Sequence, residues 1–241
     1  MKQHEAVIKI LEDKGGFATL GELYQMVDFT NWKTKTPFAT IRRIVQNDRL
    51  FFKIKPGLWA LNSHKNYVIK TLNIEKQKNQ KFNQEFNHSY YQGLLVEIGN
   101  LEGYKTFVPY QDKNKKYLAK PLQDLVTIKE FYPFTYNNVI RRAITIDVSW
   151  FNERKFPSSF FEIEHSTDIH NSLLKFLELQ DFNVNFNIVA DKVREKEFID
   201  KMNSVAFYPI RNKVKFIDYE KLAAYHSKLY EIATFRNEIV L

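Results

Sequence analysis

The chain of 241 residues has 44% hydrophobic and 27% charged side chains, the balance of a folded globular protein and not of a disordered or collagen-like one. It contains no cysteine, which excludes disulfide frameworks, zinc–thiolate sites and cysteine nucleophiles and leads us to expect a cytoplasmic protein. No long apolar stretch is free of charge, so we expect no membrane span. The net charge of +8 favours a polyanionic partner, although many basic proteins bind no nucleic acid.

Residues 1–65 predict a compact domain of three helices followed by a β-hairpin. Apolar residues at helical spacing indicate helices over 2–14, 20–27 and 37–47. The third helix is announced by Thr36 as N-cap and by Pro37 at the first helical position. The runs LFFKIK and LWAL flank a Pro-Gly turn and predict the hairpin. Helices and hairpin in this order are typical of a winged helix-turn-helix domain.

Within this domain, WKTKTPFATIRRIV followed by FFKIKPGLWAL resembles the HARE-HTH winged-helix module, which occurs in restriction enzymes and chromatin-associated proteins. The resemblance implies that helix 37–47 is a DNA-recognition helix. Inward packing of Ile41, Ile44 and Val45 would leave a polar face, and lysines flank the helix in the preceding loop and the wing strand. The candidate DNA-binding residues are therefore Lys33, Lys35, Thr40, Arg42, Arg43, Gln46, Lys53 and Lys55. The alternative is a solvated helix face in a module that binds protein.

Residues 66–86 are polar and rich in Lys, Asn and Gln, which predicts a linker or a connecting helix. From residue 87 to 241, helical and strand patterns alternate. The order is helix, three strands, helix, strand, helix, strand and helix, and strands are predicted for AITIDVSWF (143–151), SSFFEIEHS (158–166) and VAFYPIRNKVKFID (205–218). This order predicts an α/β domain with a central mixed β-sheet flanked by helices.

Three carboxylates fall on two of these predicted strands. Asp147 lies within AITIDVSWF, and Glu162 and Glu164 alternate with Ile163, so both glutamates should project from the same face of their strand. Neighbouring buried carboxylates repel one another unless a cation neutralises them, and carboxylate oxygens are the ligands that Mg²⁺ prefers. The alternative is a salt-bridged pair on a half-exposed strand, because a D…ExE pattern is common by chance.

The strings PFTYNNVIRRAITIDVSWF and FEIEHSTDIHNSLLKF resemble the PD-(D/E)xK nuclease superfamily over roughly residues 87–235. The resemblance implies that Asp147 and Glu162 hold Mg²⁺, with Mn²⁺ as a substitute, at the scissile phosphate. Glu164 stands where the superfamily most often has the lysine that orients the attacking water, and Lys105 is a candidate replacement. Glu97 matches the acidic residue that many members carry on the helix before the sheet, where it supports a second metal or its water.

The second domain contains a histidine and a run of lysines beside the predicted carboxylates. His165 should point to the strand face opposite the glutamates and is expected to be structural. An irregular segment before Asp147 carries a run of lysines, with Arg141 and Arg142 nearby. This segment could be a solvated loop or a loop that wraps DNA. The lysines are Lys113, Lys115, Lys116 and Lys120.

Together these patterns predict a Mg²⁺-dependent type II restriction endonuclease that cuts double-stranded DNA. Because double-strand cleavage needs two active sites, we expect a homodimer. A requirement for a modified base is a sub-hypothesis suggested by the HARE-HTH resemblance. The alternatives are a non-catalytic DNA-binding regulator with a degenerate nuclease domain, and an RNA-processing or repair nuclease of the same fold.

Overall fold

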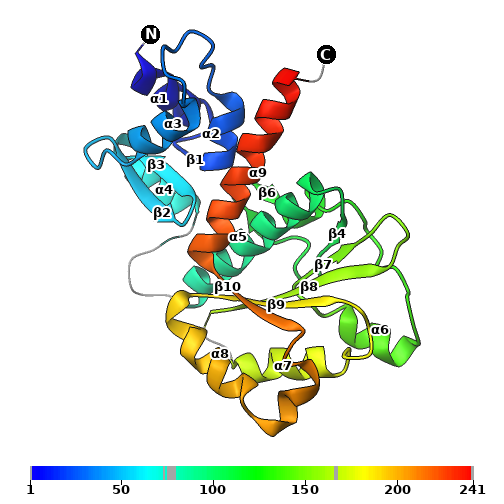
Figure 1. The fold of residues 1–241 in the computed structure, drawn as a ribbon. Helices are drawn as coiled ribbons and strands as arrows, with labels where there is room; N and C mark the ends of the chain where they lie inside the picture. The colour runs from blue at the N-terminus through cyan, green and yellow to red at the C-terminus, as the bar shows by residue number, and fades with distance from the viewer. Residues whose placement is uncertain (1, 73, 75–79, 166–167, 240–241) are drawn as a thin grey trace. The chain divides into compact units, whose positions relative to one another are not determined.

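The computed structural model describes residues 2–72, 74, 80–165 and 168–239. The chain divides into two compact units (Figure 1), one formed by residues 1–83 with 223–241 and the other by residues 84–222. This division differs from the expected one, because residues 223–241 group with the first unit and not with the second. Of the expected linker 66–86, both ends are helical, and residues 73 and 75–79 lie outside the described residues.

The first unit contains the three helices and the hairpin in the expected order. The helices are α1 (Gln3–Asp13), α2 (Leu20–Met26), α3 (Pro37–Val45) and α4 (Lys65–Thr71), and the strands are β1 (Phe17–Thr19), β2 (Phe51–Lys55) and β3 (Leu58–Leu61). The strands form an antiparallel sheet in the order β1-β3-β2. At the β2–β3 turn, Gly57 has a φ of +77°, a conformation that favours glycine.

Local sequence signals account for the starts of α2 and α3. Thr19 caps α2, because its Oγ1 accepts a hydrogen bond from the Glu22 N–H (3.1 Å) and the Glu22 carboxylate accepts one from the Thr19 N–H (2.8 Å). α3 begins at Pro37, but the Thr36 side chain makes no capping hydrogen bond, so proline alone carries the predicted start.

A long C-terminal helix, α9, spans Tyr219–Ile239. Its residues after Leu222 belong to the first unit. It packs closely against α2. A Cβ added at Gly21 would lie 2.5 Å from Cδ2 of Tyr230 and 3.0 Å from Cε1 of His226, so glycine at this position allows the two helices to approach.

The second unit is built on a five-stranded mixed sheet in the order β10-β9-β8-β7-β4, which confirms the predicted α/β class with a central mixed sheet. The strands are β4 (Lys105–Phe107), β7 (Val148–Phe151), β8 (Pro157–Glu164), β9 (Asn185–Ala190) and β10 (Val214–Asp218). β4, β7 and β8 pair antiparallel, whereas β8, β9 and β10 pair parallel. The remaining strands, β5 (Lys116–Tyr117) and β6 (Lys120–Pro121), form a separate small hairpin.

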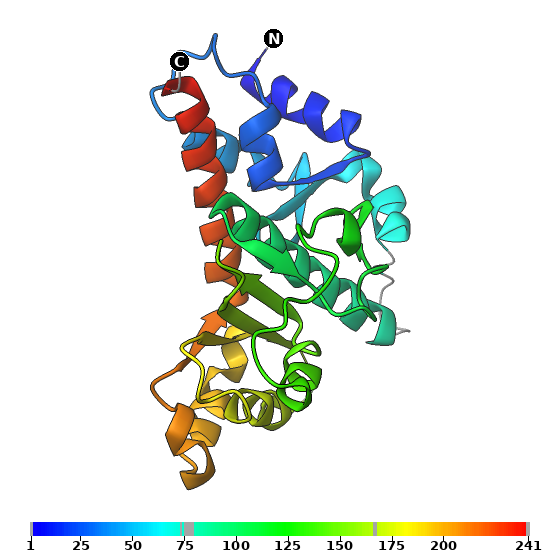
Figure 2. The same ribbon diagram turned by 90° about the vertical axis from the view of Figure 1, so that its right-hand side faces the viewer.

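Helices cover both faces of this sheet, as Figures 1 and 2 show: α5 (Gln80–Leu101) lies on one face, and α7 (Ile169–Leu177) and α8 (Glu195–Met202) lie on the other. On the α7 face, Phe176 packs 4.9 Å from Phe186 of β9, measured between ring centroids. On the α5 face, the Trp150 indole N–H donates to the Leu95 carbonyl (3.1 Å). The short helix α6 (Asn137–Ala143) precedes β7.

Two predicted strands are shorter in the structure than expected. The run 143–151 forms a strand only from Val148, because α6 extends to Ala143 and residues 144–147 form turns and bends. The run 205–218 begins with a 3₁₀-helix over Val205–Ile210 that contains Pro209, which lacks the N–H that a strand would donate. No described helix combines the length and the apolar character that crossing a bilayer would require.

Candidate active site

The two glutamates of β8 project from the same face, as their alternation predicts. Phe160 of this face belongs to the hydrophobic core, and Glu162 and Glu164 continue the face towards the end of the strand, where both are buried. The Ser172 hydroxyl of α7 lies between the two carboxylates, 3.0 Å from Oε2 of Glu162 and hydrogen-bonded to Oε1 of Glu164. Helix α7 therefore covers and aligns the acidic pair.

Asp147 lies directly before β7 and joins this pair through the strand register. Val148 pairs with Phe161 in antiparallel β7 and β8, which brings Asp147 beside Glu162. Asp147 Oδ2 accepts a hydrogen bond from the N–H of Ile163 (2.7 Å), the residue between the two glutamates. The structure thus brings the three predicted carboxylates to one place.

A lysine that the sequence analysis did not single out reaches the same place. Lys175 Nζ lies 2.8 and 2.9 Å from the two oxygens of Glu162 and 3.3 Å from the Thr145 carbonyl oxygen. Lys175 follows Ser172 by three residues on α7, so both side chains face β8. Lys105, the lysine suggested from sequence, is exposed on β4, pairs with Phe151 and does not line the cavity described below.

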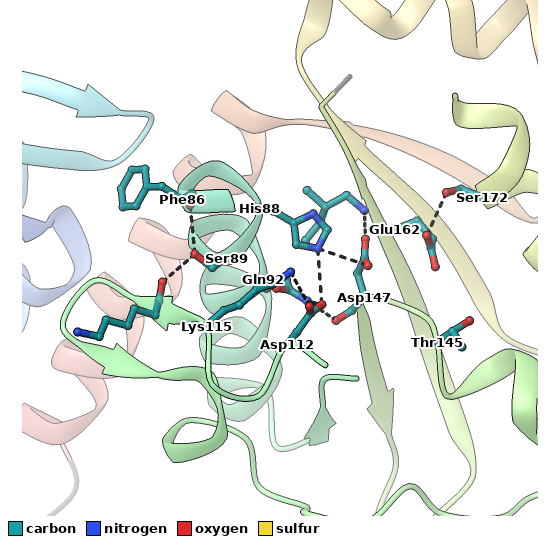
Figure 3. Close-up of polar contacts among 12 residues, drawn as sticks. Phe86, His88, Ser89, Gln92, Asp112, Lys115, Thr145, Asp147, Glu162 and Ser172 are labelled. Carbon is teal, nitrogen blue, oxygen red and sulfur yellow. Dashed lines mark hydrogen bonds and ion pairs between the residues drawn. The ribbon is translucent and has the colours of Figure 1, made fainter. Parts of the chain in front are cut away.

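The other side of Asp147 faces α5 (Figure 3). His88 Nε2 lies 3.4 Å from Oδ1 of Asp147 and 3.8 Å from Oδ2 of Asp112. The Gln92 amide N–H₂ donates to Oδ2 of Asp112 (2.8 Å) and to the Asp147 carbonyl (3.0 Å). One ligand atom each from His88, Asp112 and Asp147 lies within 4.8 Å of the others, a spacing that could hold a metal ion. Asp112 also pairs with Lys115 (2.6 Å), which neutralises part of this negative charge.

Burial and neighbouring charges shift the pKa values of Glu162, Asp147 and His88. Burial, and then the charge of Asp147, raises the pKa of Glu162 to about 8 against the opposing effect of Lys175. Burial alone would raise the pKa of Asp147, but His88, the Ile163 N–H and Lys175 together hold it below its usual range. Burial would lower the pKa of His88, but Asp147 and Asp112 raise it above its ordinary value. Strong perturbation of several groups in one place is typical of functional sites.

These side chains line one cavity of about 400 Å³ at the end of β8. Its walls come from α5, the residue before β7, the end of β8 and α7. The lining residues are Glu85, His88, Asp147, Glu162, Ile163, Glu164, His165, Asp168, Asn171, Ser172 and Lys175. Helix α5 therefore contributes Glu85 and His88, and α7 contributes Ser172 and Lys175.

Glu97 was predicted to belong to the site, but the structure places it outside the cavity. Its carboxylate accepts a hydrogen bond from the Tyr117 hydroxyl (2.9 Å), and it does not line the cavity. Glu97 follows His88 by nine residues, which is about 2.5 helical turns, so the two side chains project from different sides of α5 roughly 13 Å apart along its axis. The acidic residue that α5 presents to the cavity is Glu85.

His165 packs against aromatic rings on the α5 face, as strand alternation predicts. Its Nδ1 lies 2.6 Å from the hydroxyl of Tyr219, and its ring centroid lies 5.9 Å from that of Tyr91. It also lines the cavity. Ser172 and Lys175 could have been found from their i, i+3 spacing in the helix after the ExE pair, whereas no local signal connects His88 or Asp112 with Asp147.

In the first unit, the candidate DNA-binding residues fall into two groups. Lys33, Lys35, Arg43, Gln46 and Lys53 are exposed. The other three are at least half-buried. Thr40 is buried and its hydroxyl donates to the Thr36 carbonyl (3.0 Å), while Arg42 donates to the Tyr24 hydroxyl (3.1 Å) and Lys55 is half-buried. Thr40 is thus no part of an exposed recognition face, because a helical threonine can bond the carbonyl four residues before it.

Comparison with known proteins identifies a family over most of the chain. A family model described as the type II restriction enzyme NmeDI C-terminal domain matches residues 69–239. The chain belongs to this family. The type II restriction enzyme NmeDI of Neisseria meningitidis serogroup C is 30% identical over 122 residues, which make up 46% of this chain and 35% of that protein. The matched segment thus spans about a third of the relative's length, and no solved structure matches the chain significantly.

Proposed function

We propose that this protein is a type II restriction endonuclease that cuts double-stranded DNA by Mg²⁺-dependent phosphodiester hydrolysis in the manner of PD-(D/E)xK nucleases. The observation that carries the proposal is the convergence of Asp147, Glu162 and Glu164 with Lys175 on one cavity, in a chain of a restriction-enzyme family. Cavities lined by carboxylates beside a cationic group suit phosphoryl chemistry, because the phosphate and its attacking water need both.

The donor atoms fit a hard divalent cation. Asp147 and Glu162 present carboxylate oxygens to the same cavity, and burial together with the charge of Asp147 raises the pKa of Glu162, so a cation bound between them would stabilise its ionised form. We assign these two residues as the ligands of Mg²⁺, or of Mn²⁺ as its substitute. When bound, such an ion would neutralise charge on the phosphate and favour deprotonation of the attacking water.

The protein's own groups supply the remaining functions. Lys175 carries the positive charge that the strand position of Glu164 lacks, and its reach into the cavity suits it to orient the attacking water or to contact the phosphate. Glu164 and Glu162 both accept from the Ser172 hydroxyl, and Oε2 of Glu164 lies 3.9 Å from Nη1 of Arg194. We assign Glu164 either to the alignment of the acidic pair or to the role of a base towards water.

We further propose that the first unit is a HARE-HTH-like winged helix that docks on DNA through its exposed basic residues, among them Lys33, Lys35, Arg43 and Lys53. Cutting both strands needs two cavities of this kind, which we propose a homodimer supplies. Dependence on a modified base is the variant of this proposal that the winged-helix resemblance suggests.

Two competing functions are compared with this proposal, a non-catalytic regulator and a nuclease that acts on another substrate. A non-catalytic regulator is favoured by one observation, the glutamate at position 164 where the nuclease motif has lysine. The position of Lys175 weakens that argument, because the positive charge enters the cavity from α7. An RNA-processing or repair nuclease would use the same groups and differ only in substrate.

The test is cleavage of plasmid DNA, and of methylated and unmethylated phage DNA, in the presence of Mg²⁺. The wild type, Asp147→Asn and Glu162→Gln are compared with Glu153→Gln, a control that removes an exposed carboxylate from the β7–β8 turn. We expect discrete fragments from the wild type and the control and none from the two site variants. DNA retention in a gel shift without cleavage by any of the four, in Mg²⁺ or Mn²⁺, would favour the regulator.

A further inference from the structure

A lysine-rich hairpin lies in the second unit outside the cavity. Residues 113–121 contain four lysines and no acidic residue, and they include β5 and β6 with the turn between them. Lys113, Lys116 and Lys120 are exposed, whereas Lys115 is half-buried and paired with Asp112. Three positive side chains with no acid among them form a local positive surface on the unit that holds the candidate active site.

The hairpin is held rigidly against α5. Ser89, which follows the cavity residue His88, donates its hydroxyl hydrogen bond to the Lys116 carbonyl (2.7 Å). The Tyr117 ring packs directly on the helix, because a Cβ added at Gly93 would lie 2.0 Å from its Cδ2. The Tyr117 hydroxyl is fixed by Glu97. The lysines are therefore carried on a hairpin whose position relative to α5 is fixed by contacts with Ser89, Gly93 and Glu97.

Asp112, directly before the hairpin, is linked by contacts to the candidate metal ligand Asp147. Asp112 is buried and bonds Gln92, and its Oδ2 lies 3.8 Å from His88 Nε2, which in turn lies 3.4 Å from Asp147. Figure 3 shows Lys115, Asp112 and His88 in succession on the path to Asp147. A short chain of contacts thus places the start of the hairpin close to the cavity.

The turn of the hairpin keeps an unfavourable backbone conformation. Leu118 has a φ of +54°, in the left-handed region that a bulky residue seldom adopts. Such conformations persist where the surrounding structure holds them, and they are frequent at ligand clamps. Here the turn sets Lys116 and Lys120 on paired strands that are only two residues long.

We propose that the β5–β6 hairpin is a phosphate clamp that holds the DNA backbone next to the cavity through Lys113, Lys116 and Lys120. The proposal rests on the proposed nuclease function, because the phosphates it binds flank the one that is cleaved. Contacts of this kind read no base sequence and act through charge, so they should depend on salt and not on the recognition site.

The test measures DNA binding by fluorescence anisotropy in Ca²⁺ at several salt concentrations, using the full chain with Lys113→Gln, Lys116→Gln and Lys120→Gln combined. The matched control removes three exposed lysines from other elements of the same unit, by Lys196→Gln, Lys215→Gln and Lys221→Gln. Losing three phosphate contacts should reduce the slope of log Kd against log salt by roughly 2–3 and weaken binding at least about 10-fold. The control should change the slope by less than about 1.

The outcomes separate this inference from the proposed function. Wild-type protein that neither binds nor cuts DNA would contradict the nuclease and the clamp together. Wild-type protein that cuts DNA, with a hairpin variant whose affinity and salt slope match the wild type or the control, would overturn the clamp alone. Melting temperatures within a few degrees of the wild type show that the variants are folded, and since all six lysines are exposed, we expect this for both.

Discussion

Lys175 of α7 donates hydrogen bonds to both carboxylate oxygens of Glu162 on β8, with Nζ 2.8 and 2.9 Å from them. This pairing brings a positive charge into the cavity that Glu162 and Glu164 line. Ser172 on the same helix bonds both glutamates, so α7 contacts β8 through two of its side chains.

Replacement of Lys175 by methionine should reduce the DNA cleavage rate roughly 10²–10³-fold, the usual cost of removing a group that stabilises the transition state. Lys175→Arg should retain more activity, because it keeps the charge. Single-turnover cleavage measures both, with Lys196→Met on α8 as the control. DNA affinity should fall far less than the cleavage rate in Lys175→Met, because at most one phosphate contact is lost, and cleavage at the wild-type rate by this variant would remove Lys175 from the mechanism.

Binding of Mn²⁺ or Mg²⁺ should strengthen as the pH rises. The pKa of Glu162 is raised to about 8, so below this pH the metal must displace its proton. His88 has a raised pKa as well, and its charge repels a cation until it deprotonates, so both groups act in the same direction. Calorimetric titration should show affinity rising by about tenfold per pH unit for the Glu162 proton alone, and levelling off above about pH 8. Affinity that falls between pH 6 and 8 would contradict the assignment of Glu162 as a ligand.

Gly93→Ala should destabilise the protein by about 1–3 kcal/mol, because the new Cβ would overlap the Tyr117 ring that lies 2.0 Å away. Urea denaturation measures the loss. The double variant with Tyr117→Ala should show strong non-additivity, since the overlap disappears with the ring. An unchanged urea midpoint for Gly93→Ala would mean that the hairpin does not pack on α5 as described.

Thr40→Val and Arg43→Gln should separate stability from DNA binding in the first unit. Thr40 is buried and bonded to the Thr36 carbonyl, so its replacement should cost about 1 kcal/mol of stability and leave DNA affinity unchanged. Arg43 is exposed, so Arg43→Gln should keep the melting temperature and lower the salt slope of DNA binding by about 1. The reverse pattern would place the DNA surface elsewhere.

The sequence by itself determined the α/β class with its mixed sheet, the helices and hairpin of the first unit, and the carboxylates Asp147, Glu162 and Glu164. These depend on local rules, namely the period of apolar residues, helix-start residues and strand alternation, which act over a few positions. Glu162 and Glu164 could be assigned to one face for this reason alone.

Only the tertiary structure decided which other groups complete the site. Lys175 reaches Glu162 because α7 packs across β8, and His88 meets Asp147 across 59 positions of sequence because α5 lies on the other face of the sheet. Glu97 had the expected residue type on the expected helix, but the helical period turns it towards Tyr117. Helix packing fixes such long-range contacts, and a local pattern carries no information on the rotation of one helix against a distant strand.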